Sequence, residues 1–548
     1  MTDHEPQRGS AAASFDLTTQ PWIPVLHDDG TQSELSLRDV FANADDLRRL
    51  IGDVPTQEFA LLRLLLAVVH DALDGGPADT DEWAELWADK NCFAPVADYL
   101  TTHREAFDLL HPQRPFFQVA GLRTARDEVF ELNRIVADVP AGAPYLSSRM
   151  PGVDRLEFGE AARWLVHAHA FDTSGIKTGL DGDDRVKGGK VYPLGVGWAG
   201  TLGGVFIEGG TLRETLLLNL IARDHPDVRQ EADDRPAWRR DPYGPGPAGR
   251  VRPTGLRDLY TWQSRRLLLH HDRQAVRGVV LGYGDPLAPR NMQVHEPMTA
   301  WRRSKAQEKK HGVVPCYLPR EHDPSRSAWR GLEALLADRA EADHGPEAPP
   351  SIRPRVIEWV SHLVSDAGVL PRRFHVRART VGVFYGTQQS VIDEVVDDHV
   401  SMDVVLLHRE DREYARQAVA AVGDADDAVR VLGDLATDLA DAAGLDAEPR
   451  RAGARDLGYA ALDEPYRLWL RNLSAGDDPY AARDHWRREV HKAVLRLGGG
   501  LVREAGEAAW QGRTVKAGSG TVWLNAASAE RWFRFRLRKA LGDPNPTP

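Results

Sequence analysis

The chain has 548 residues, of which 42% are hydrophobic and 27% charged, a composition typical of a soluble globular protein with several domains or subdomains. Its two cysteines, Cys92 and Cys316, lie far apart without CxxC spacing, which excludes a disulfide framework and a cysteine zinc site and indicates the cytoplasm. The polar, acidic amino terminus lacks a signal-peptide pattern, and the most apolar stretch, residues 59–73, is too short to span a membrane, so we expect no membrane association.

The net charge of −12 conceals two regions of opposite sign. Residues 229–320 hold 18 Lys/Arg against 9 Asp/Glu, an excess of +9, whereas residues 393–448 hold 4 against 16, an excess of −12. We interpret the first region as one that holds phosphate, and the second as one that repels phosphate or meets a basic partner. Solvated surfaces of unrelated sign would give the same counts.

The first part of the chain predicts a β-hairpin followed by helices. The segment FDLTTQPWIPVL ends in an apolar strand, Asp28-Asp29-Gly30 supplies a turn, and a second strand leads into Ser36, a predicted N-cap. Thr56 is the predicted cap of a buried helix. This helix contains the apolar stretch 59–73, and further elements are expected as helices at 80–90 and 158–169 and as a strand entry at 111–119.

Residues 175–210 contain twelve of the chain's 48 glycines. Glycine costs more backbone entropy on folding than other residues, and it is retained where a side chain would obstruct a turn or a close approach to a ligand. We interpret this glycine block as an ordered loop-and-hairpin surface whose backbone N–H groups press against a large partner. A glycine-rich connection without a ligand is the alternative.

The rest of the chain changes from mixed to helical character. Thr211 is predicted to cap a helix over 211–223, an exposed loop follows to residue 256, and alternating segments up to residue 300 predict strands. Gly386 marks a turn expected to enter a helix. Beyond about residue 400, amphipathic segments predict an antiparallel, four-helix-type bundle, with Pro465 just inside a helix start. We therefore predict an α+β fold with a mixed α/β domain over residues 1–398 and a helical bundle over 399–548.

Signatures of catalysis are weak. The sequence contains no GxxxxGK[ST], GxSxG or HExxH motif, and the GxGxxG match beginning at Gly195 precedes a strand-like run instead of a helix. The pairs His70-Asp71 and His270-His271-Asp272 superficially resemble HD sites of metal-dependent phosphohydrolases, but other ligands at suitable spacing are not visible. We expect no enzyme activity, metal or cofactor. A metal-dependent nuclease using His270, His271 and Asp272 is the alternative, and a purely structural scaffold is another.

The remaining features suit binding to nucleic acid. Gln388 and Gln389 follow the flexible Gly386, and carboxamides can both donate to and accept from base edges. Arginine and lysine satisfy base acceptors and phosphates. A solvated helix start would explain the two glutamines equally well.

Taken in order, the segments resemble the large subunit of type I-E CRISPR Cascade, the CasA family. The resemblance rests on FDLTTQPWIPVL with LSLRDVF, on HPQRPFFQV, on the glycine block followed by TLRETLLLNL, on YGTQQSVIDE and on the carboxy-terminal helices. It covers the chain from Phe15 to Leu541. It implies a non-catalytic subunit that recognises a protospacer-adjacent motif in double-stranded DNA through the minor groove and starts R-loop formation.

The resemblance also implies partners and site residues. The partners are CRISPR RNA, target DNA, the backbone and small Cascade subunits, and a recruited helicase–nuclease, which we expect the acidic bundle to help bind. Gln389, with Gln388 beside it, matches a glutamine wedge. The glycine loop falls within Tyr192 to Gly200. The remaining assignments are Gly195 and Gly197 for this loop, Arg290 and Asn291 for a basic finger, and Ser147, Ser148 and Arg149 for docking on the RNA 5′ handle and backbone subunit. The zinc site of some relatives does not carry over, because its cysteines are absent here.

Overall fold

The computed structural model describes residues 13–137, 152–336, 348–371, 373–408, 410–517 and 520–542. The chain divides into two compact units. Unit 1 comprises Met1–Arg326, Ala337–Val360 and Ala378–Asp398, and unit 2 comprises Ser327–Leu336, Ser361–Arg377 and His399–Pro548. No helix among these described ranges combines the length and apolar character needed to cross a membrane.

Unit 1 begins with the predicted hairpin. Strands β1 (Ile23–His27) and β2 (Gln32–Leu35) pair antiparallel, and β3 (Leu47–Leu50) pairs with the other edge of β1. Between β2 and β3, helix α1 (Leu37–Ala42) starts at Ser36, whose hydroxyl accepts the Asp39 N–H. The predicted N-cap is therefore confirmed.

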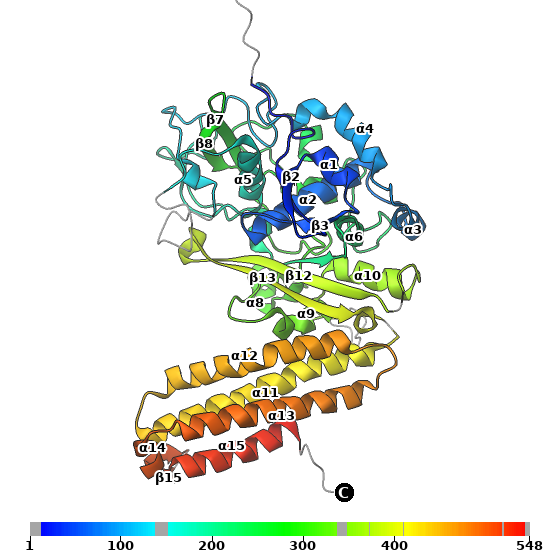
Figure 1. Cartoon of the computed structure of the whole chain (residues 1–548). Helices are drawn as coiled ribbons and strands as arrows, with labels where there is room; N and C mark the ends of the chain where they lie inside the picture. Colours follow the sequence, from blue (N-terminus) through cyan, green and yellow to red (C-terminus); the bar gives the residue numbers. More distant parts are fainter. Residues whose placement is uncertain are drawn as a thin grey trace, which may run out of the picture. The chain divides into compact units, whose positions relative to one another are not determined.

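Helix α2 (Pro55–Ala72) lies among the other elements of unit 1 (Figure 1) and forms its core, since the side chains are buried along almost the whole helix. It packs against α5 (Phe158–Phe171) and α7 (Leu256–Tyr260). The prediction that Thr56 caps this helix is wrong. Val54 occupies the cap position, and the Thr56 hydroxyl instead meets His167 Nε2 at 2.9 Å across the core.

Short elements surround this core. The prediction of a strand at 111–119 is wrong, because the two prolines of that segment place it in turns. The first of the alternating segments predicted as strands, LYTWQ at residues 259–263, instead begins inside α7. The other elements that begin in unit 1 are α3 (Thr80–Ala88), α4 (Ala94–Thr102), β4 (Lys177–Thr178), β5 (Lys190–Val191), β6 (Gly204–Glu208), α6 (Leu212–Leu218), β7 (Arg265–His271), β8 (Val276–Tyr283), β9 (Trp301–Arg303), α8 (Lys305–His311), β10 (Tyr317–Pro319), β11 (Ser351–Ile352) and α10 (Arg355–Ser365).

A long hairpin carries the predicted glutamine wedge (Figure 1). Strands β12 (His375–Tyr385) and β13 (Ile392–Asp403) are neighbours in a sheet whose order is β13-β12-β6. The helix predicted after Gly386 is therefore wrong, and a second strand follows the turn. The β-branched residues of SVIDEVV explain the outcome, because they favour a pleated surface over a helix.

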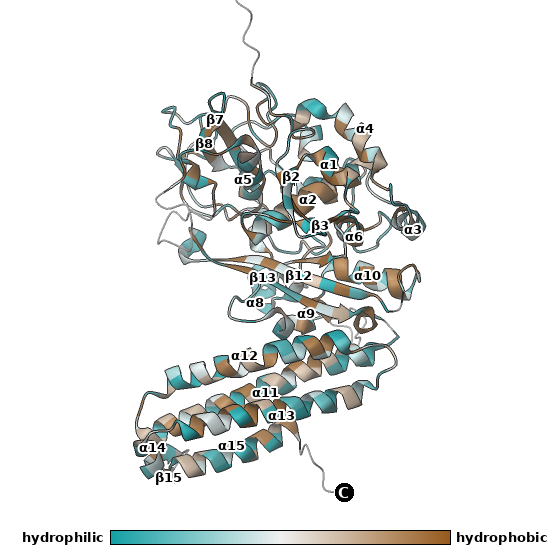
Figure 2. Cartoon of the chain, in the orientation of Figure 1, coloured by the Kyte–Doolittle hydropathy of each residue, from teal (hydrophilic) through white to brown (hydrophobic). Residues whose placement is uncertain are grey.

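Unit 2 contains the predicted helical bundle. Helices α11 (Arg412–Ala443), α12 (Ala447–Asn472), α13 (Pro479–Arg503) and α15 (Ala526–Leu541) have apolar residues on their inward faces and polar residues outside (Figure 2). Helix α11 packs against the other three, and α13 packs against both α12 and α15. The smaller elements are α9 (Leu332–Leu336), α14 (Glu507–Gln511), β14 (Arg513–Ala517) and β15 (Gly520–Leu524).

The prediction that a helix starts at Pro465 is wrong. Pro465 lies in the interior of α12 and not at a helix start. The buried residues Leu462, Tyr466 and Leu470 repeat every four positions across it, so the apolar stripe continues past the proline. Burial of this stripe outweighs the lost backbone hydrogen bond. The α+β fold with a carboxy-terminal bundle is confirmed.

The acidic excess of residues 393–448 is partly neutralised inside unit 2. Asp424 on α11 accepts hydrogen bonds from Arg483 at 2.7 and 2.9 Å and from Arg487 at 3.1 Å, both on α13. Asp438 pairs with Arg536 of α15. These aspartates therefore hold the bundle together, which a count of charges along the sequence could not reveal.

Candidate nucleic-acid interface

One buried arginine organises the backbone at the start of the glycine block. The Arg265 side chain is 2% exposed and contacts the Asp172 carboxylate. It also donates to the backbone carbonyls of Asp172 at 2.9 Å, Thr173 at 3.1 Å and Gly195 at 3.0 Å. Lys177 Nζ lies 2.7 Å from the same carboxylate. Although burial favours the neutral acid, these two cations hold the pKa of Asp172 below its ordinary value.

Ser174 joins the predicted wedge to the predicted glycine loop. Its backbone N–H donates to the Gln389 carbonyl at 2.7 Å. Its hydroxyl oxygen accepts the Gly195 N–H at 3.2 Å. Ser174 is 3% exposed, whereas Gly195 is half-buried and Gln389 is exposed, so the two bonds run from the interior to the surface. Two segments that are almost 200 positions apart in sequence are thus connected through a single residue.

The predicted glycines have different surroundings. Gly195 has a φ of 105°, and a Cβ built on it would have no atom within 4 Å. A Cβ at Gly197 would lie 2.5 Å from the carbonyl carbon of Ala170 in α5. Gly197 is therefore required by packing inside the protein, whereas Gly195 has open space in front of it. The exposed side chains beside Gly195 include Tyr192 and Leu194, which are 61% and 38% exposed.

The two glutamines form the tip of the β12–β13 hairpin. Gln388 and Gln389 both have a φ of 56°, and both are exposed. The Gln389 N–H donates to the Gly386 carbonyl at 2.8 Å, and the Gly386 N–H donates to Val391 at 3.0 Å, which closes the turn. A left-handed conformation costs a non-glycine residue about 1–2 kcal/mol. The surrounding structure therefore maintains a strained tip that presents two carboxamides to solvent.

A pocket of about 840 Å³ opens beside this tip. Ser390 and Ile392 of the hairpin line one part of it, and Phe130 and Arg134 line another. The Arg134 guanidinium stands 4.4 Å from the centre of the Phe130 ring. Sequence reasoning missed this pocket because its walls come from four separate segments.

The two residues predicted as a basic finger differ in availability. Asn291 uses its polar groups within the fold. Its N–H donates to the Tyr317 carbonyl, its side-chain oxygen accepts the Tyr317 N–H, and its side-chain nitrogen donates to the Pro315 carbonyl. Arg290 is half-buried and has no acidic partner among the described residues. The nearby helix α8 contributes further exposed cations, namely Lys305, Lys309 and Lys310. The predicted RNA-docking residues Ser147, Ser148 and Arg149 lie outside the described residues.

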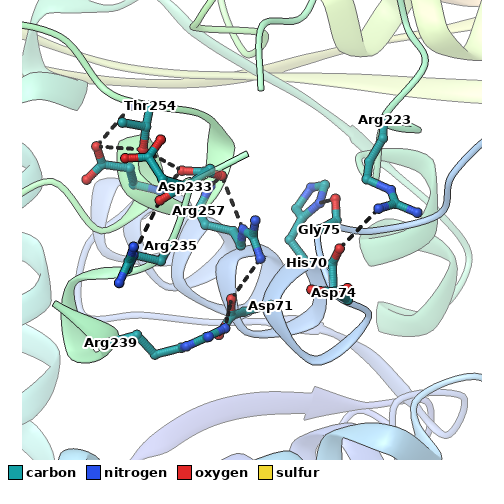
Figure 3. A network of polar contacts seen from close by, with 12 residues as sticks. His70, Asp71, Asp74, Gly75, Arg223, Asp233, Arg235, Arg239, Thr254 and Arg257 are labelled. Carbon is teal, nitrogen blue, oxygen red and sulfur yellow. Dashed lines mark hydrogen bonds and ion pairs between the residues drawn. The ribbon is translucent and has the colours of Figure 1, made fainter. Parts of the chain in front are cut away.

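Much of the arginine-rich middle region is used inside unit 1 (Figure 3). Asp71 of α2 accepts hydrogen bonds from Arg239 at 2.9 Å and from Arg257 at 3.0 Å. Arg257 also contacts Asp234, and Arg266 pairs with Asp285 at 2.7 Å. The local excess of positive charge therefore overstates the cations available to a phosphate partner.

The histidine–aspartate pairs have structural surroundings. His70 is buried beside Gly75 in Figure 3, and burial lowers its pKa to about 4. Asp272 accepts the Gln274 and Ala275 N–H groups and an Arg277 hydrogen bond at 2.8 Å, and so closes the β7–β8 turn. Within the described ranges, no group of three or more His, Cys, Asp or Glu could hold a metal ion.

Known proteins share this architecture, in which an α+β region containing the glycine block is followed by a helical bundle. Residues 16–497 match the family described as CRISPR-associated protein Cse1. A CRISPR-associated protein CasA/Cse1 of Thermus thermophilus is 31% identical over 338 residues, which are 59% of this chain and 60% of that relative's length.

Solved structures agree with this match. The structure of Thermobifida fusca Cse1 is 57% identical, covers 96% of this chain and 98% of its own, and superposes with a TM-score of 0.89. Cse1 of Acidimicrobium ferrooxidans is 30% identical, with coverages of 98% and 99% and a TM-score of 0.82. A chain of a structure titled CRISPR RNA-guided surveillance complex shares the fold, with 18% identity, coverages of 96% and 99% and a TM-score of 0.68. The chain therefore belongs to the CRISPR-associated protein Cse1 (CasA) family, and the resemblance noted from its sequence is confirmed.

Proposed function

We propose that this chain is a subunit of a CRISPR RNA-guided surveillance complex that recognises a protospacer-adjacent motif in duplex DNA and begins to unwind the duplex. Its membership of the Cse1 family supports the assignment to such a complex. In this proposal guide RNA supplies sequence specificity by base pairing, and this protein licenses the site and starts the opening. The work is binding, with no covalent bond made or broken.

The observation that carries the proposal is the strained, exposed tip at Gln388 and Gln389. A side chain inserted between base steps must overcome a few kcal/mol of stacking, so it needs a rigid support. The hairpin strands and the Ser174–Gln389 hydrogen bond of 2.7 Å provide that support. Because carboxamides both donate and accept hydrogen bonds, they can also replace contacts that the separated bases lose.

The glycine loop would read the motif from the minor groove. That groove is only about 6 Å wide and distinguishes mainly A·T from G·C pairs, so a backbone without side chains fits it and tolerates related motifs. Gly195 suits this role because the space in front of it is open. Gly197 would support the loop from behind, against α5.

Phosphate contacts and protein partners complete the proposal. Arg290 and the exposed lysines of α8 are among the cations of this region that remain available to neutralise a DNA backbone. The segment containing Ser147, Ser148 and Arg149 would dock on the RNA 5′ handle and a backbone subunit. Unit 2 would meet the small subunits and the recruited helicase–nuclease.

The test is to replace Gln389 in the assembled complex and compare two targets. We expect Gln389→Ala to weaken binding to duplex target by about tenfold or more and to leave binding to a pre-melted target unchanged, because only the duplex requires unstacking. Gel shifts with both targets measure the difference. Gln389→Asn is the matched control, since asparagine keeps a carboxamide and tolerates the left-handed conformation. Equal losses on the two targets would refute the wedge.

A further inference from the structure

The outer face of helix α15 combines unpaired cations with an exposed aromatic ring. Its buried residues, including Ala529, Phe533 and Leu537, face the bundle. At 100° per residue, Arg531, Phe535 and Arg538 fall on the opposite side. Phe535 is 63% exposed, which is unusual for a ring at the centre of a well-packed helix.

The helix carries an excess of positive charge that the bundle does not use. Of its five cations, Arg534 pairs with Glu530 at 2.7 Å and Arg536 pairs with Asp438. Arg531, Arg538 and Lys539 are exposed and have no acidic partner within the described ranges. Cations in the last turn also complement a helix dipole, which accounts for Arg538 and Lys539 but not for Arg531 or for the ring between them.

The neighbouring helix α13 has exposed cations of its own. Its core residues Trp486, Val490 and Val494 repeat every four positions, and exposed cations repeat with the same spacing on the opposite side. Helix α13 packs directly against α15 through its core side, where Gly498 meets Phe533. The exposed cations of α13 are Arg488, Lys492, Arg496 and Arg503.

We propose that the outer faces of α13 and α15 bind single-stranded nucleic acid, with Phe535 stacking on a base and the flanking cations contacting phosphates. Proteins that bind single strands without sequence preference combine a cationic track with exposed aromatic rings. Duplex DNA would use the cations but not the ring, because its bases are already stacked. The alternative ligand of this surface is a protein whose acidic groups pair with these cations, and the experiment must distinguish that protein from nucleic acid.

The experiment uses the full-length chain and a fluorescein-labelled 20-nucleotide oligothymidylate, with anisotropy measured from 50 to 300 mM salt. We expect the double variant Arg531→Glu/Arg538→Glu to bind at least about tenfold more weakly. Its salt slope should fall by about 1.4, since each lost phosphate contact on a single strand removes about 0.7. We expect Phe535→Ala to bind about tenfold more weakly with an unchanged salt slope, because stacking releases no counterion.

Arg430→Glu is the matched control, because Arg430 is an exposed arginine of α11 that is paired with Asp427. It should bind the oligonucleotide like the unmodified protein. All four positions point away from the bundle core, so circular dichroism and the thermal midpoint should not change, and Arg538→Gln serves if the double variant fails to fold. Unchanged binding by both test variants, or an equal loss in Arg430→Glu, would overturn the proposal. Normal oligonucleotide binding with lost capture of companion subunits would assign the surface to protein docking instead.

The result is separable from the function proposed above. Gln388 and Gln389 lie in unit 1, so their replacement should leave oligothymidylate binding intact. Conversely, loss of the α15 face should leave recognition of the motif on a short duplex unchanged. Failure of one proposal therefore does not decide the other.

Discussion

Replacing Ser174 by alanine should separate recognition of the motif from the rest of DNA binding. The change removes the oxygen that accepts the Gly195 N–H at 3.2 Å, and it leaves the Ser174 N–H to Gln389 bond of 2.7 Å in place. A typical hydrogen bond contributes about 0.5–1.5 kcal/mol to stability. Because Gly195 is half-buried, water can reach its N–H once the hydroxyl is removed, so the larger cost of a buried, unpaired donor does not apply. We therefore expect the ordered glycine loop to be destabilised by about 0.5–1.5 kcal/mol, which corresponds to about 2- to 13-fold weaker binding to a target with the correct motif.

The assay compares assembled complexes on three targets: a duplex with the correct motif, a duplex with an incorrect motif, and a pre-melted target. For Ser174→Ala, affinity for the correct duplex should fall toward that for the incorrect one, while affinity for the pre-melted target stays constant. Ser174→Cys, which is close in size but a weaker acceptor, should give an intermediate loss. Full discrimination between the motifs by Ser174→Ala would refute the reasoning, as would an equal loss on all three targets.

Two further outcomes test the glycine block and the core. Gly197→Val should abolish soluble folding, because its Cβ would lie 2.5 Å from the Ala170 carbonyl carbon, and wild-type stability of this variant in thermal melting would contradict the packing. Gly195→Ala should fold, because its Cβ meets no atom within 4 Å, but the φ of 105° strains the loop backbone, and we expect motif discrimination to be lost. Lowering the pH from 7 to 5 should lower the thermal midpoint, because burial depresses the pKa of His70 to about 4 and of both His167 and His169 to about 3. Below the unfolded value of about 6.5 the unfolded chain binds these protons and the folded chain does not, at a cost of about 2 kcal/mol per histidine at pH 5. A midpoint that is constant between pH 7 and 5 would show that these rings are solvated.

The sequence alone predicts those elements whose formation depends on residues only a few positions apart. The Ser36 cap is predictable because its hydroxyl and Asp39 lie one turn apart, and α2 is predictable because its apolar residues repeat at three- and four-residue spacing. The bundle followed from amphipathic segments with short connections. The family followed from the order of motifs that are individually weak.

The failures have a shared cause in long-range pairing. The segment after Gly386 contains enough polar residues to suggest a helix start, but β12 supplies a strand partner that the local pattern cannot show. Ser174 and Arg265 were missed because their importance depends on Gln389 and Gly195, which are distant in sequence. The arginines of the middle region were overcounted as free cations for the same reason.

The backbone of the hairpin tip has a consequence for engineering this protein. Consecutive residues with a φ of 56° are positions at which asparagine and glycine are the natural occupants, so a consensus or thermostability screen would replace Gln388 and Gln389 early. Each replacement by glycine would relax the chain and remove a carboxamide. If these carboxamides open the duplex as proposed, a heat-selected library would accumulate stable proteins that have lost this activity, so a screen for stability needs a parallel selection for interference.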